Sequence, residues 1–264
     1  MPGRVVLLDL DDCVAGAIWP FSSRPRKPVD RAIIGALLQE IERSGLCVHL
    51  LTNRPPGQLP VIGHIMGGPA RYHLAESGLS AWLPDENRAI VHPQFVEFAE
   101  HVRPRVIERL RAHLQISPDG PIVEEFGTRL VSLTVFPLHG DVGQIQQLCE
   151  RIRRLLDDLP VEVRVGKGVD IAPAGTDKVV GCKWAEVLHP DLQGAQLNWH
   201  EVLYIEDSTT GLRAAKYILE RGGMVAAVAN AAPELKEIVN QRGGIICDNA
   251  GEAGVLEAIR RWLA

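Results

Sequence analysis

The sequence predicts an α/β protein in which a doubly wound parallel sheet is interrupted by an inserted α+β domain. Apolar runs typical of buried strands alternate with helical stretches near both ends of the chain. The middle of the chain instead carries strands in which apolar and polar residues alternate, as in half-exposed antiparallel sheets. The 264 residues, 46% of them hydrophobic, suffice for a core domain with a smaller one inserted into it.

The N-terminal part of the chain contains a strand, a helix and a second strand. VVLLD at 5–9 and LCVHLL at 46–51 are apolar enough to be buried strands. Between them, apolar residues recur at helical spacing from about Asp30 to Ser44, and Gly45 follows as a typical helix end. This order predicts a βαβ unit with two parallel strands.

The same alternation returns near the C-terminus. EVLYI at 201–205, MVAAVA at 224–229 and GIIC at 244–247 are separated by helical stretches rich in Ala, Leu and Ile. The segment GVLEAIRRWL then predicts a last helix. We therefore expect residues 1–82 and 168–264 to form one Rossmann-like core.

The middle of the chain has a different pattern. RLVSLTVF at 129–136 and VEVRV at 161–165 alternate strictly, which indicates antiparallel strands. A helix expected at 143–156 has its apolar residues on one stripe, so it would cover one face of that small sheet. We expect an α+β domain at 83–167.

Composition excludes several classes of partner. The net charge of −5, with cations and acids interspersed, gives no basic face for nucleic acid and no polybasic membrane anchor. No apolar run approaches the roughly 18 residues of a membrane span, and no signal-peptide pattern precedes the first strand. The basic residues Arg24, Arg26 and Lys27 are read as a solvated loop. We expect a cytoplasmic protein, monomeric or a weak homodimer, that acts on a small molecule.

Acidic residues follow the first strand directly. In LLDLDDC, Asp9, Asp11 and Asp12 lie where open parallel sheets bind ligands, beyond the carboxyl end of a strand. Carboxylates crowded in this way repel one another, so a cation is needed to keep them ionised. Hard divalent ions such as Mg²⁺ prefer oxygen ligands, so these carboxylates are candidates for a metal site. The alternative is a solvated acidic turn, which would contain the same residues.

The other strand ends carry complementary groups. Thr52, a hydroxyl donor, follows the second strand, and Glu206 and Asp207 follow the strand at 201–205. Lys178 begins a helix, where a cation opposes the helix dipole unless an anion lies in front of it. If the sheet is parallel, these side chains converge on one edge.

The order of DLDDC, Thr52, Lys178 and EDSTTG at 206–211 resembles the four motifs of the haloacid dehalogenase-like hydrolase superfamily. The long insertion after the second motif and AESG at 75–78 are similar to the Cof-like branch with a type-two cap, which includes trehalose-, sucrose- and mannosyl-phosphoglycerate phosphatases. The resemblance implies a magnesium-dependent phosphoric monoester hydrolase that acts on a small phosphorylated metabolite, such as a sugar phosphate. The inserted domain would be its cap.

The resemblance also implies roles for the acidic residues. Asp9 would attack phosphorus and form an aspartyl-phosphate. Asp11 would protonate the departing oxygen and later accept a proton from the attacking water. Asp9, the main-chain carbonyl of Asp11 and Asp207 would hold Mg²⁺. Glu206 would support the waters of that ion.

Further residues are candidates for contact with the substrate. Thr52 and Lys178 would donate hydrogen bonds to the transferring phosphoryl group. Residues beside the second motif and on the strands of the inserted domain add polar groups that could contact the leaving group. The candidate substrate-binding residues are Thr52, Asn53, Arg54, Lys178, Glu125 and Arg129.

The chain departs from the family pattern at three positions. Asp12 and Cys13 stand where the family usually has Gly and Thr, so an extra charge and a thiol lie near the nucleophile. Neighbouring carboxylates raise the pKa of a thiol, which favours a structural role for Cys13 over a nucleophilic one. Gly211 stands where the Cof-like branch has another Asp, and the pair formed by Glu206 and Asp207 resembles the phosphoglucomutase-like branch.

Two alternative functions share these motifs. A phosphomutase would return the phosphoryl group from the same aspartate to another hydroxyl of the sugar. A non-catalytic protein that binds a sugar phosphate could keep the fold without turnover, although every catalytic position is filled in this chain. The motifs alone do not separate these functions.

Overall fold

The fold was obtained as a computed structural model, which describes residues 4–14, 30–60, 70–116, 122–137, 142–166, 168–189 and 197–264. The basic loop residues Arg24, Arg26 and Lys27 lie outside the described residues. Within the described part of the chain, no helix is both long and apolar enough to cross a membrane.

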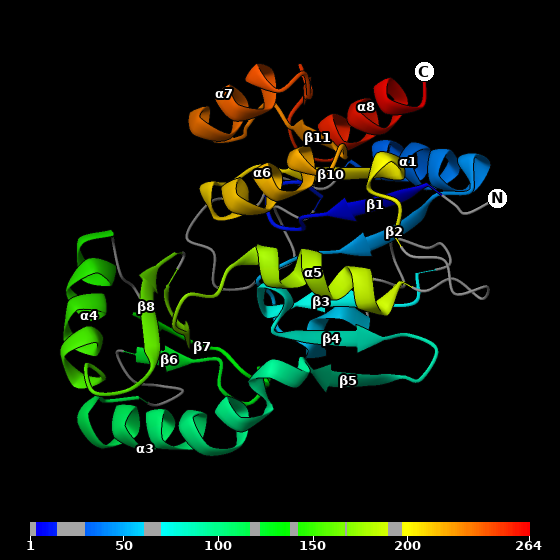
Figure 1. Ribbon diagram of the computed structural model, residues 1–264. Helices are drawn as coiled ribbons and strands as arrows, with labels where there is room; N and C mark the ends of the chain where they lie inside the picture. The colour runs from blue at the N-terminus through cyan, green and yellow to red at the C-terminus, as the bar shows by residue number, and fades with distance from the viewer. Residues whose placement is uncertain are drawn as a thin grey trace.

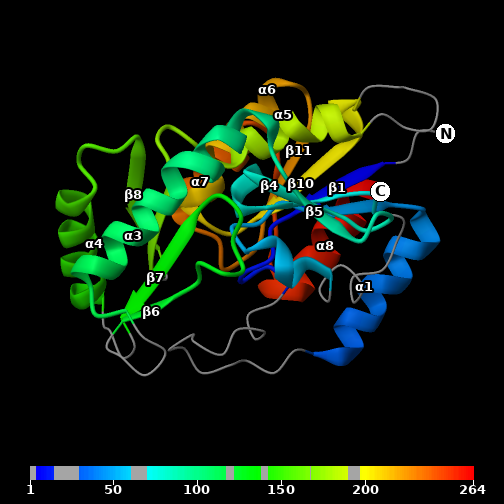
Figure 2. The same ribbon diagram turned by 90° about the horizontal axis from the view of Figure 1, so that it is seen from below.

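The central sheet is parallel and has the strand order β12-β11-β10-β1-β2. Its strands β1 and β10 are buried along their whole length because helices cover both faces. Figure 2 shows α1 and α8 on one side of β1 and β10, and α5 and α6 on the other. This arrangement confirms the predicted α/β class with a doubly wound parallel sheet. The strands are β1 (Val5–Leu8), β2 (Cys47–Leu50), β10 (Val202–Glu206), β11 (Met224–Ala227) and β12 (Ile245–Ile246).

The helices of the core begin and end at residues that the sequence favours for these positions. In α1, the Asp30 side chain accepts hydrogen bonds from the first-turn amides of Ala32 and Ile33. Gly45 then ends the helix in the left-handed conformation, with φ of 60°. The helices packed on the central sheet are α1 (Arg31–Ser44), α5 (Lys178–Leu188), α6 (Leu212–Glu220), α7 (Pro233–Gln241) and α8 (Gly251–Leu263).

A small antiparallel sheet follows β2 and was not predicted. It consists of β3 (His73–Ala75), β4 (Ser80–Leu83) and β5 (Arg88–Val91). A parallel bridge between Leu51 and Leu74 joins it to the end of β2. The short sheet therefore extends the core beside the loop that follows the second motif.

The second half of the insertion is a four-stranded antiparallel sheet with the order β6-β7-β9-β8. Figure 1 shows this sheet, with α3 and α4, to one side of the central sheet. The apolar stripe of α4 packs on the sheet as predicted, because Leu148, Cys149 and Ile152 share a cluster with strand residues such as Val163 and Ile171. The elements are β6 (Ile122–Glu124), β7 (Leu133–Pro137), β8 (Val161–Val165), β9 (Val169–Pro173), α3 (Arg103–His113) and α4 (Val142–Leu155).

The division of the chain at 83 and 167 stays a prediction. Strand β9 begins at Val169, two residues beyond that division, and pairs with both β7 and β8. The apolar residues of this sheet and its helices also form a cluster separate from that of the central sheet. We therefore propose that the inserted domain includes β9.

Candidate active site

The carboxyl ends of β2, β1 and β10 lie side by side at one edge of the central sheet. Leu8 is in register with Leu50 on one side and with Ile205 on the other. The residues that follow these strands are therefore level with one another. Asp9, Thr52 and Asp207 occupy this edge, as expected for a parallel sheet.

Lys178 links two of the acidic residues at this edge. Its Nζ lies 2.8 Å from Oδ1 of Asp9 and 2.6 Å from Oε2 of Glu206, and all three residues are buried. Lys178 is the first residue of α5, where Asp177 caps the helix by accepting from the amide of Val179. Burial alone would lower the pKa of Lys178, but the charges and hydrogen bonds of Asp9 and Glu206 raise it. Lys178 is therefore a permanent cation in a site of carboxylates.

Glu206 is surrounded by donors other than Lys178. The Tyr204 hydroxyl donates to Oε2, while the Asp207 amide and both the amide and hydroxyl of Ser208 donate to Oε1. Burial would raise the pKa of Glu206, but the charge and hydrogen bond of Lys178, together with these other donors, lower it. Glu206 therefore orients Lys178. The contact of Glu206 with metal-bound waters stays a prediction.

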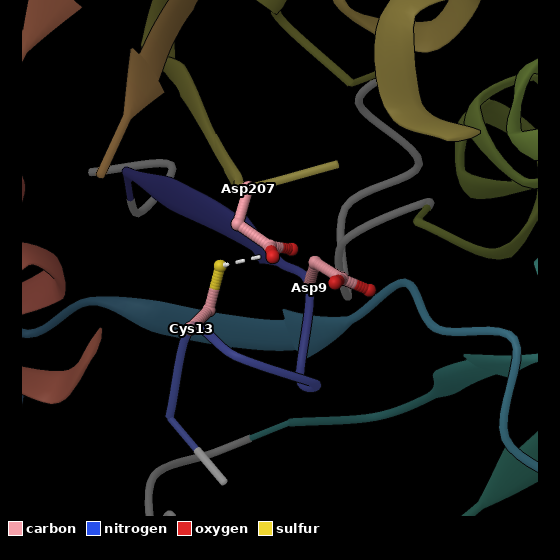
Figure 3. Close-up of side chains that lie close together, drawn as sticks. All are labelled: Asp9, Cys13 and Asp207. Atoms are coloured by element: carbon pink, nitrogen blue, oxygen red, sulfur yellow. Dashed lines mark hydrogen bonds between the residues drawn. The ribbon is translucent and has the colours of Figure 1, made fainter. Parts of the chain in front are cut away.

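Asp9, Cys13 and Asp207 bring their ligand atoms within 4.8 Å of one another. Figure 3 shows the sulfur of Cys13 facing the carboxylate of Asp207, beside Asp9. Burial, followed by the charge of Glu206, raises the pKa of Asp9 to about 7. Burial, followed by the charge of Asp9, raises the pKa of Asp207 to about 8. Carboxylates whose ionised forms are destabilised by burial and by like-charged neighbours fit a hard divalent cation such as Mg²⁺.

Cys13 places a buried thiol beside the carboxylates of Asp9 and Asp207. Burial raises the pKa of Cys13 far above its ordinary value, and the charges of Asp9 and Asp207 raise it further. Its Sγ lies 4.0 Å from Oδ1 of Asp207. The expectation that nearby carboxylates suppress the thiolate agrees with this geometry.

Asp11 is held by the guanidinium of Arg54. Arg54 Nε lies 3.1 Å from Oδ2 of Asp11, and Nη2 lies 2.6 Å from Oδ1. The side chain of Arg54 is 7% exposed and that of Asp11 is 31% exposed, so the pair lies at the boundary between core and solvent. This bidentate contact fixes the orientation of the Asp11 carboxylate.

Thr52 and Asn53 face different parts of the molecule. Thr52 is fully buried, and its Oγ1 accepts from the Arg54 amide at 3.2 Å, which leaves the hydroxyl hydrogen to be donated. Asn53 Nδ2 instead donates to Oδ2 of Asp170 on β9 at 3.1 Å. The loop after β2 therefore joins the sheet edge to the inserted sheet.

Arg129 and Glu125 form a buried ion pair beside this loop. Arg129 Nη2 lies 3.0 Å from Oε2 of Glu125, and their side chains are 5% and 10% exposed. Arg129 Nη1 also donates to the Asn53 carbonyl at 2.8 Å and to the hydroxyl of Ser132 at 3.1 Å. Burial raises the pKa of Glu125 despite the opposing charge of Arg129. Both predicted residues lie at the junction, but the donors of Arg129 contact the protein itself.

Two acidic residues at this junction were not predicted as site residues. Asp170 accepts from Asn53, and its Oδ1 also accepts from the Thr134 hydroxyl at 2.6 Å. The signal for Asp170 was the alternation of VDIAP, which places it on one face of a strand. The second residue is Glu76 of AESG, for which the resemblance was the only signal.

Glu76 is fully buried and holds the segment that precedes β7. It begins the 3₁₀ turn η2 (Glu76–Gly78), and both Glu76 and Ser77 have positive φ, which is uncommon for such residues. The donors to its carboxylate are the amides of Leu130, Val131 and Ser132 and the hydroxyls of Ser132 and Ser80. Glu76 is therefore the anchor between the core and the inserted sheet.

The turn η2 also contacts the loop after β2 and the helix that carries Lys178. The amides of Glu76 and Ser77 donate to the carbonyls of Arg54 and Thr52, at 2.9 and 2.8 Å. Gly78, with φ of 94°, lies so close to Gly181 of α5 that an added Cβ would meet the Gly181 Cα at 2.2 Å. Only glycine permits this backbone and this approach.

No protein-family model matches the sequence, and no curated protein matches it. Solved structures do match. A haloacid dehalogenase-like hydrolase from Bacteroides thetaiotaomicron aligns over 98% of this chain and 99% of its own, with a TM-score of 0.66 and 18% identity. The chain has the haloacid dehalogenase-like fold. The resemblance drawn from the four motifs is thus confirmed at the level of the fold.

Two sugar-phosphate phosphatases share this fold with the chain. The sucrose-phosphatase of Synechocystis, solved with sucrose and phosphate, aligns over 99% of this chain and 98% of its own, with a TM-score of 0.62 and 16% identity. The C-terminal domain of a trehalose-6-phosphate phosphatase from C. albicans aligns over 99% and 92%, with a TM-score of 0.63 and 17% identity. The haloacid dehalogenase-like fold therefore extends over the inserted domain as well as the core.

Proposed function

We propose that this protein is a magnesium-dependent phosphatase that hydrolyses a small phosphorylated metabolite, of the sugar-phosphate class, through an aspartyl-phosphate on Asp9. The observation that carries the proposal is the group formed by buried Asp9 and Lys178 and half-buried Asp207 at the carboxyl edge of the sheet. It occurs in a fold shared with phosphatases that act on sugar phosphates. A cytoplasmic, monomeric or weakly dimeric protein remains part of the proposal.

In the first step, an oxygen of the Asp9 carboxylate forms a bond to phosphorus as the bond to the sugar oxygen breaks. Asp11 gives its proton to that leaving oxygen, so the sugar departs as an alcohol. The bidentate contact with Arg54 orients the Asp11 carboxylate and favours its ionised form, which is the form that accepts a proton in the second step. In the second step, a water oxygen attacks the same phosphorus, Asp11 takes a proton from the water, and Asp9 is released.

Charge on the phosphoryl group is balanced by groups that are already in position. Lys178, held by Glu206, supplies a fixed cation next to the nucleophile. Thr52 donates its hydroxyl hydrogen to a phosphoryl oxygen. Donors fixed in this way before the reaction contribute several kcal/mol, about 2.7–4 kcal/mol for one such donor.

Asp9, Asp207 and the main-chain carbonyl of Asp11 would hold Mg²⁺, with Glu206 supporting its waters. When bound, the ion supplies positive charge that lets an anionic carboxylate approach an anionic phosphate. The raised pKa values of Asp9 and Asp207 support this assignment, because both groups gain from a nearby cation.

The leaving group would face the junction between the loop after β2 and the inserted sheet. Asn53, Asp170 and Thr134 form a chain of hydrogen-bonding groups there, which suits a leaving group rich in hydroxyls. Arg54, Glu125 and Arg129 stay candidates for substrate contact. The contacts of Arg129 with Glu125 and with the Asn53 carbonyl favour a positioning role for that pair.

The proposal is tested by comparing Asp9→Asn with Asp12→Asn on p-nitrophenyl phosphate and on a panel of sugar phosphates. Asp9→Asn should lose on the order of 10³-fold or more of the Mg²⁺-dependent rate, because it removes the nucleophile. Asp12→Asn is the matched control, since Asn tolerates the positive φ of 60° at this position.

Three outcomes distinguish the alternatives. Inactivity of the wild-type protein with every substrate in Mg²⁺ would favour a sugar-phosphate-binding protein. Conversion of one sugar phosphate into another without release of phosphate would favour a phosphomutase. Phosphate released in proportion to the substrate consumed, and abolished by a chelator, agrees with the proposed hydrolysis.

A further inference from the structure

Cys13 brings a sulfur atom to the group of carboxylates proposed to hold Mg²⁺. Its Sγ lies 4.0 Å from Oδ1 of Asp207, and ligand atoms of Asp9, Cys13 and Asp207 all lie within 4.8 Å of one another. Cys13 is fully buried and Asp9 is 5% exposed. Figure 3 shows the three side chains converging from the loop after β1 and the end of β10.

The position of this sulfur is fixed by the main chain. The amide of Val14 donates to the carbonyl of Leu10 at 3.0 Å, which closes the turn that contains Cys13. The side chain of Asn230 donates to the carbonyl of Asp12 at 2.9 Å, and its own oxygen accepts from the Gly251 amide at the start of α8. The turn is thereby tied to a helix of the core, so Cys13 stays beside the two carboxylates.

A sulfur among two carboxylates changes which cations fit. Mg²⁺ takes oxygen ligands, whereas Zn²⁺, Co²⁺ and Cd²⁺ bind thiolate sulfur strongly. Ligand distances of about 2.3 Å to sulfur and about 2.1 Å to oxygen, at a tetrahedral angle, separate sulfur and oxygen by about 3.6 Å. The observed 4.0 Å needs only a small approach of Cys13 and Asp207.

We propose that Cys13 makes this site a binding site for thiophilic divalent cations, held by Asp9, Asp207 and the Cys13 sulfur in place of Mg²⁺. The thiol proton passes to solvent as the bond between metal and sulfur forms. An ion held in this way would occupy the place of Mg²⁺ and be retained by the additional sulfur ligand, so Zn²⁺ opposes the Mg²⁺-dependent reaction. The inference rests on the proposed function, because it concerns the same cation site.

Cobalt reports sulfur ligation directly, without any activity measurement. The metal-free, full-length protein is titrated with Co²⁺ while the near-ultraviolet charge-transfer band from thiolate to Co²⁺ is recorded. The wild type should show the band, and Cys13→Ser should lose it. Cys149→Ser is the matched control, because Cys149 is equally buried but lies in the inserted domain. It should keep the band.

The outcome that overturns the inference is a wild type without the band, or a band that persists in Cys13→Ser. Persistence would point to another thiol, such as Cys47, whose Sγ lies 3.1 Å from Nε2 of His49. Circular dichroism establishes that each variant is folded before titration. Asp207→Asn is a second variant, and it should weaken Co²⁺ binding without removing the sulfur.

Inhibition by Zn²⁺ at constant Mg²⁺ gives an independent measurement. Cys13→Ser should need at least about tenfold more Zn²⁺ for half inhibition, because loss of even an outer-shell partner costs roughly 10–100-fold in metal affinity. The two proposals fail in different ways. A cobalt band without phosphatase activity would remove the proposed function alone, while Mg²⁺-dependent activity without the band would remove only the role of Cys13.

Discussion

The anchor of the inserted domain has a buried carboxylate that is satisfied by donors, whereas the edge of the central sheet combines one such carboxylate with others that have like-charged neighbours. Glu76 and Glu206 are both fully buried, and hydrogen-bond donors surround each of them. Asp9 and Asp207 lie beside other acids, and burial raises the pKa of these two groups to about 7 and about 8. The comparison teaches that a carboxylate satisfied by the protein maintains the structure, whereas one left with like-charged neighbours is available for a cation or for chemistry.

The largest effect on stability is expected from substitution of Lys178, whose ammonium group contacts two carboxylates at the sheet edge. Lys178→Met would leave Asp9 and Glu206 buried without their partner, which costs about 3–5 kcal/mol in the free energy of unfolding. Urea denaturation measures this loss, and phosphatase activity should fall as well. Lys183→Met, an exposed position on the same helix, should stay within about 0.5 kcal/mol of the wild type. Equal stability of the two variants would contradict the comparison.

The second-largest effect on stability is expected from substitution of Glu76, the anchor between the core and the inserted sheet. Glu76→Gln replaces one acceptor oxygen with an NH₂ group that faces main-chain amides, so the free energy of unfolding should fall by about 2–3 kcal/mol. Activity should fall less than in Lys178→Met, because Glu76 holds the inserted domain and is outside the proposed catalytic group. Glu108→Gln on the exposed side of α3 is the control. A fully active, fully stable Glu76→Gln protein would show that the anchor is dispensable.

The free energy of unfolding, measured across pH, tests the carboxylates of the sheet edge without mutation. Asp carboxyls ionise near pH 3.9 in an unfolded chain, so the raised pKa values of Asp9 and Asp207 mean that the folded protein binds more protons between about pH 4 and 8. The free energy of unfolding of the metal-free protein should therefore fall as pH rises through this range, because the folded state binds protons that the unfolded chain has already released.

Magnesium should reverse this loss, because it replaces the protons. Stabilisation by a fixed Mg²⁺ concentration should be larger at pH 8 than at pH 6, as measured by denaturation with and without the ion. Asp207→Asn should flatten this dependence. A stabilisation that is the same at every pH would argue against a cation at these carboxylates.

The smallest effect is expected from substitution of Arg54, which orients the partly exposed Asp11. Arg54→Lys keeps the charge but loses the bidentate contact, so the maximal rate should fall by roughly tenfold, well below the 10²–10⁴ expected for removing the general acid itself. Stability should change little. The measurement is the rate of p-nitrophenyl phosphate hydrolysis across pH, compared with Arg88→Lys at the exposed first residue of β5.

The sequence was informative where a local pattern determines the structure. The buried strands ending in Asp9, Thr52 and Glu206 could be located because parallel sheets need continuous apolar runs, and their shared edge followed from topology. The small sheet of β3, β4 and β5 was missed because each of its strands begins with a polar residue, His73, Ser80 or Arg88, and continues with no more than three apolar ones.

Contacts between distant segments could not be predicted in the same way. The sequence of β9 alternates apolar and polar residues, but its pairing with β7 and β8 depends on the inserted sheet as a whole. The sequence around Arg129 shows a polar residue but does not indicate which group it contacts. The contact between Arg129 and Asn53 joins residues that are 76 positions apart in the chain. Glu76 likewise binds amides more than fifty positions away.

The close approach of Gly78 and Gly181 has a mechanical consequence. Two stretches of main chain touch there with no side chain between them, so little can be compressed at the point of contact. One stretch belongs to the turn that carries Glu76, and the other to the helix that carries Lys178. The turn that holds the inserted sheet and the helix that begins with Lys178 therefore cannot approach each other further, so the position of the anchor limits where the lysine can lie.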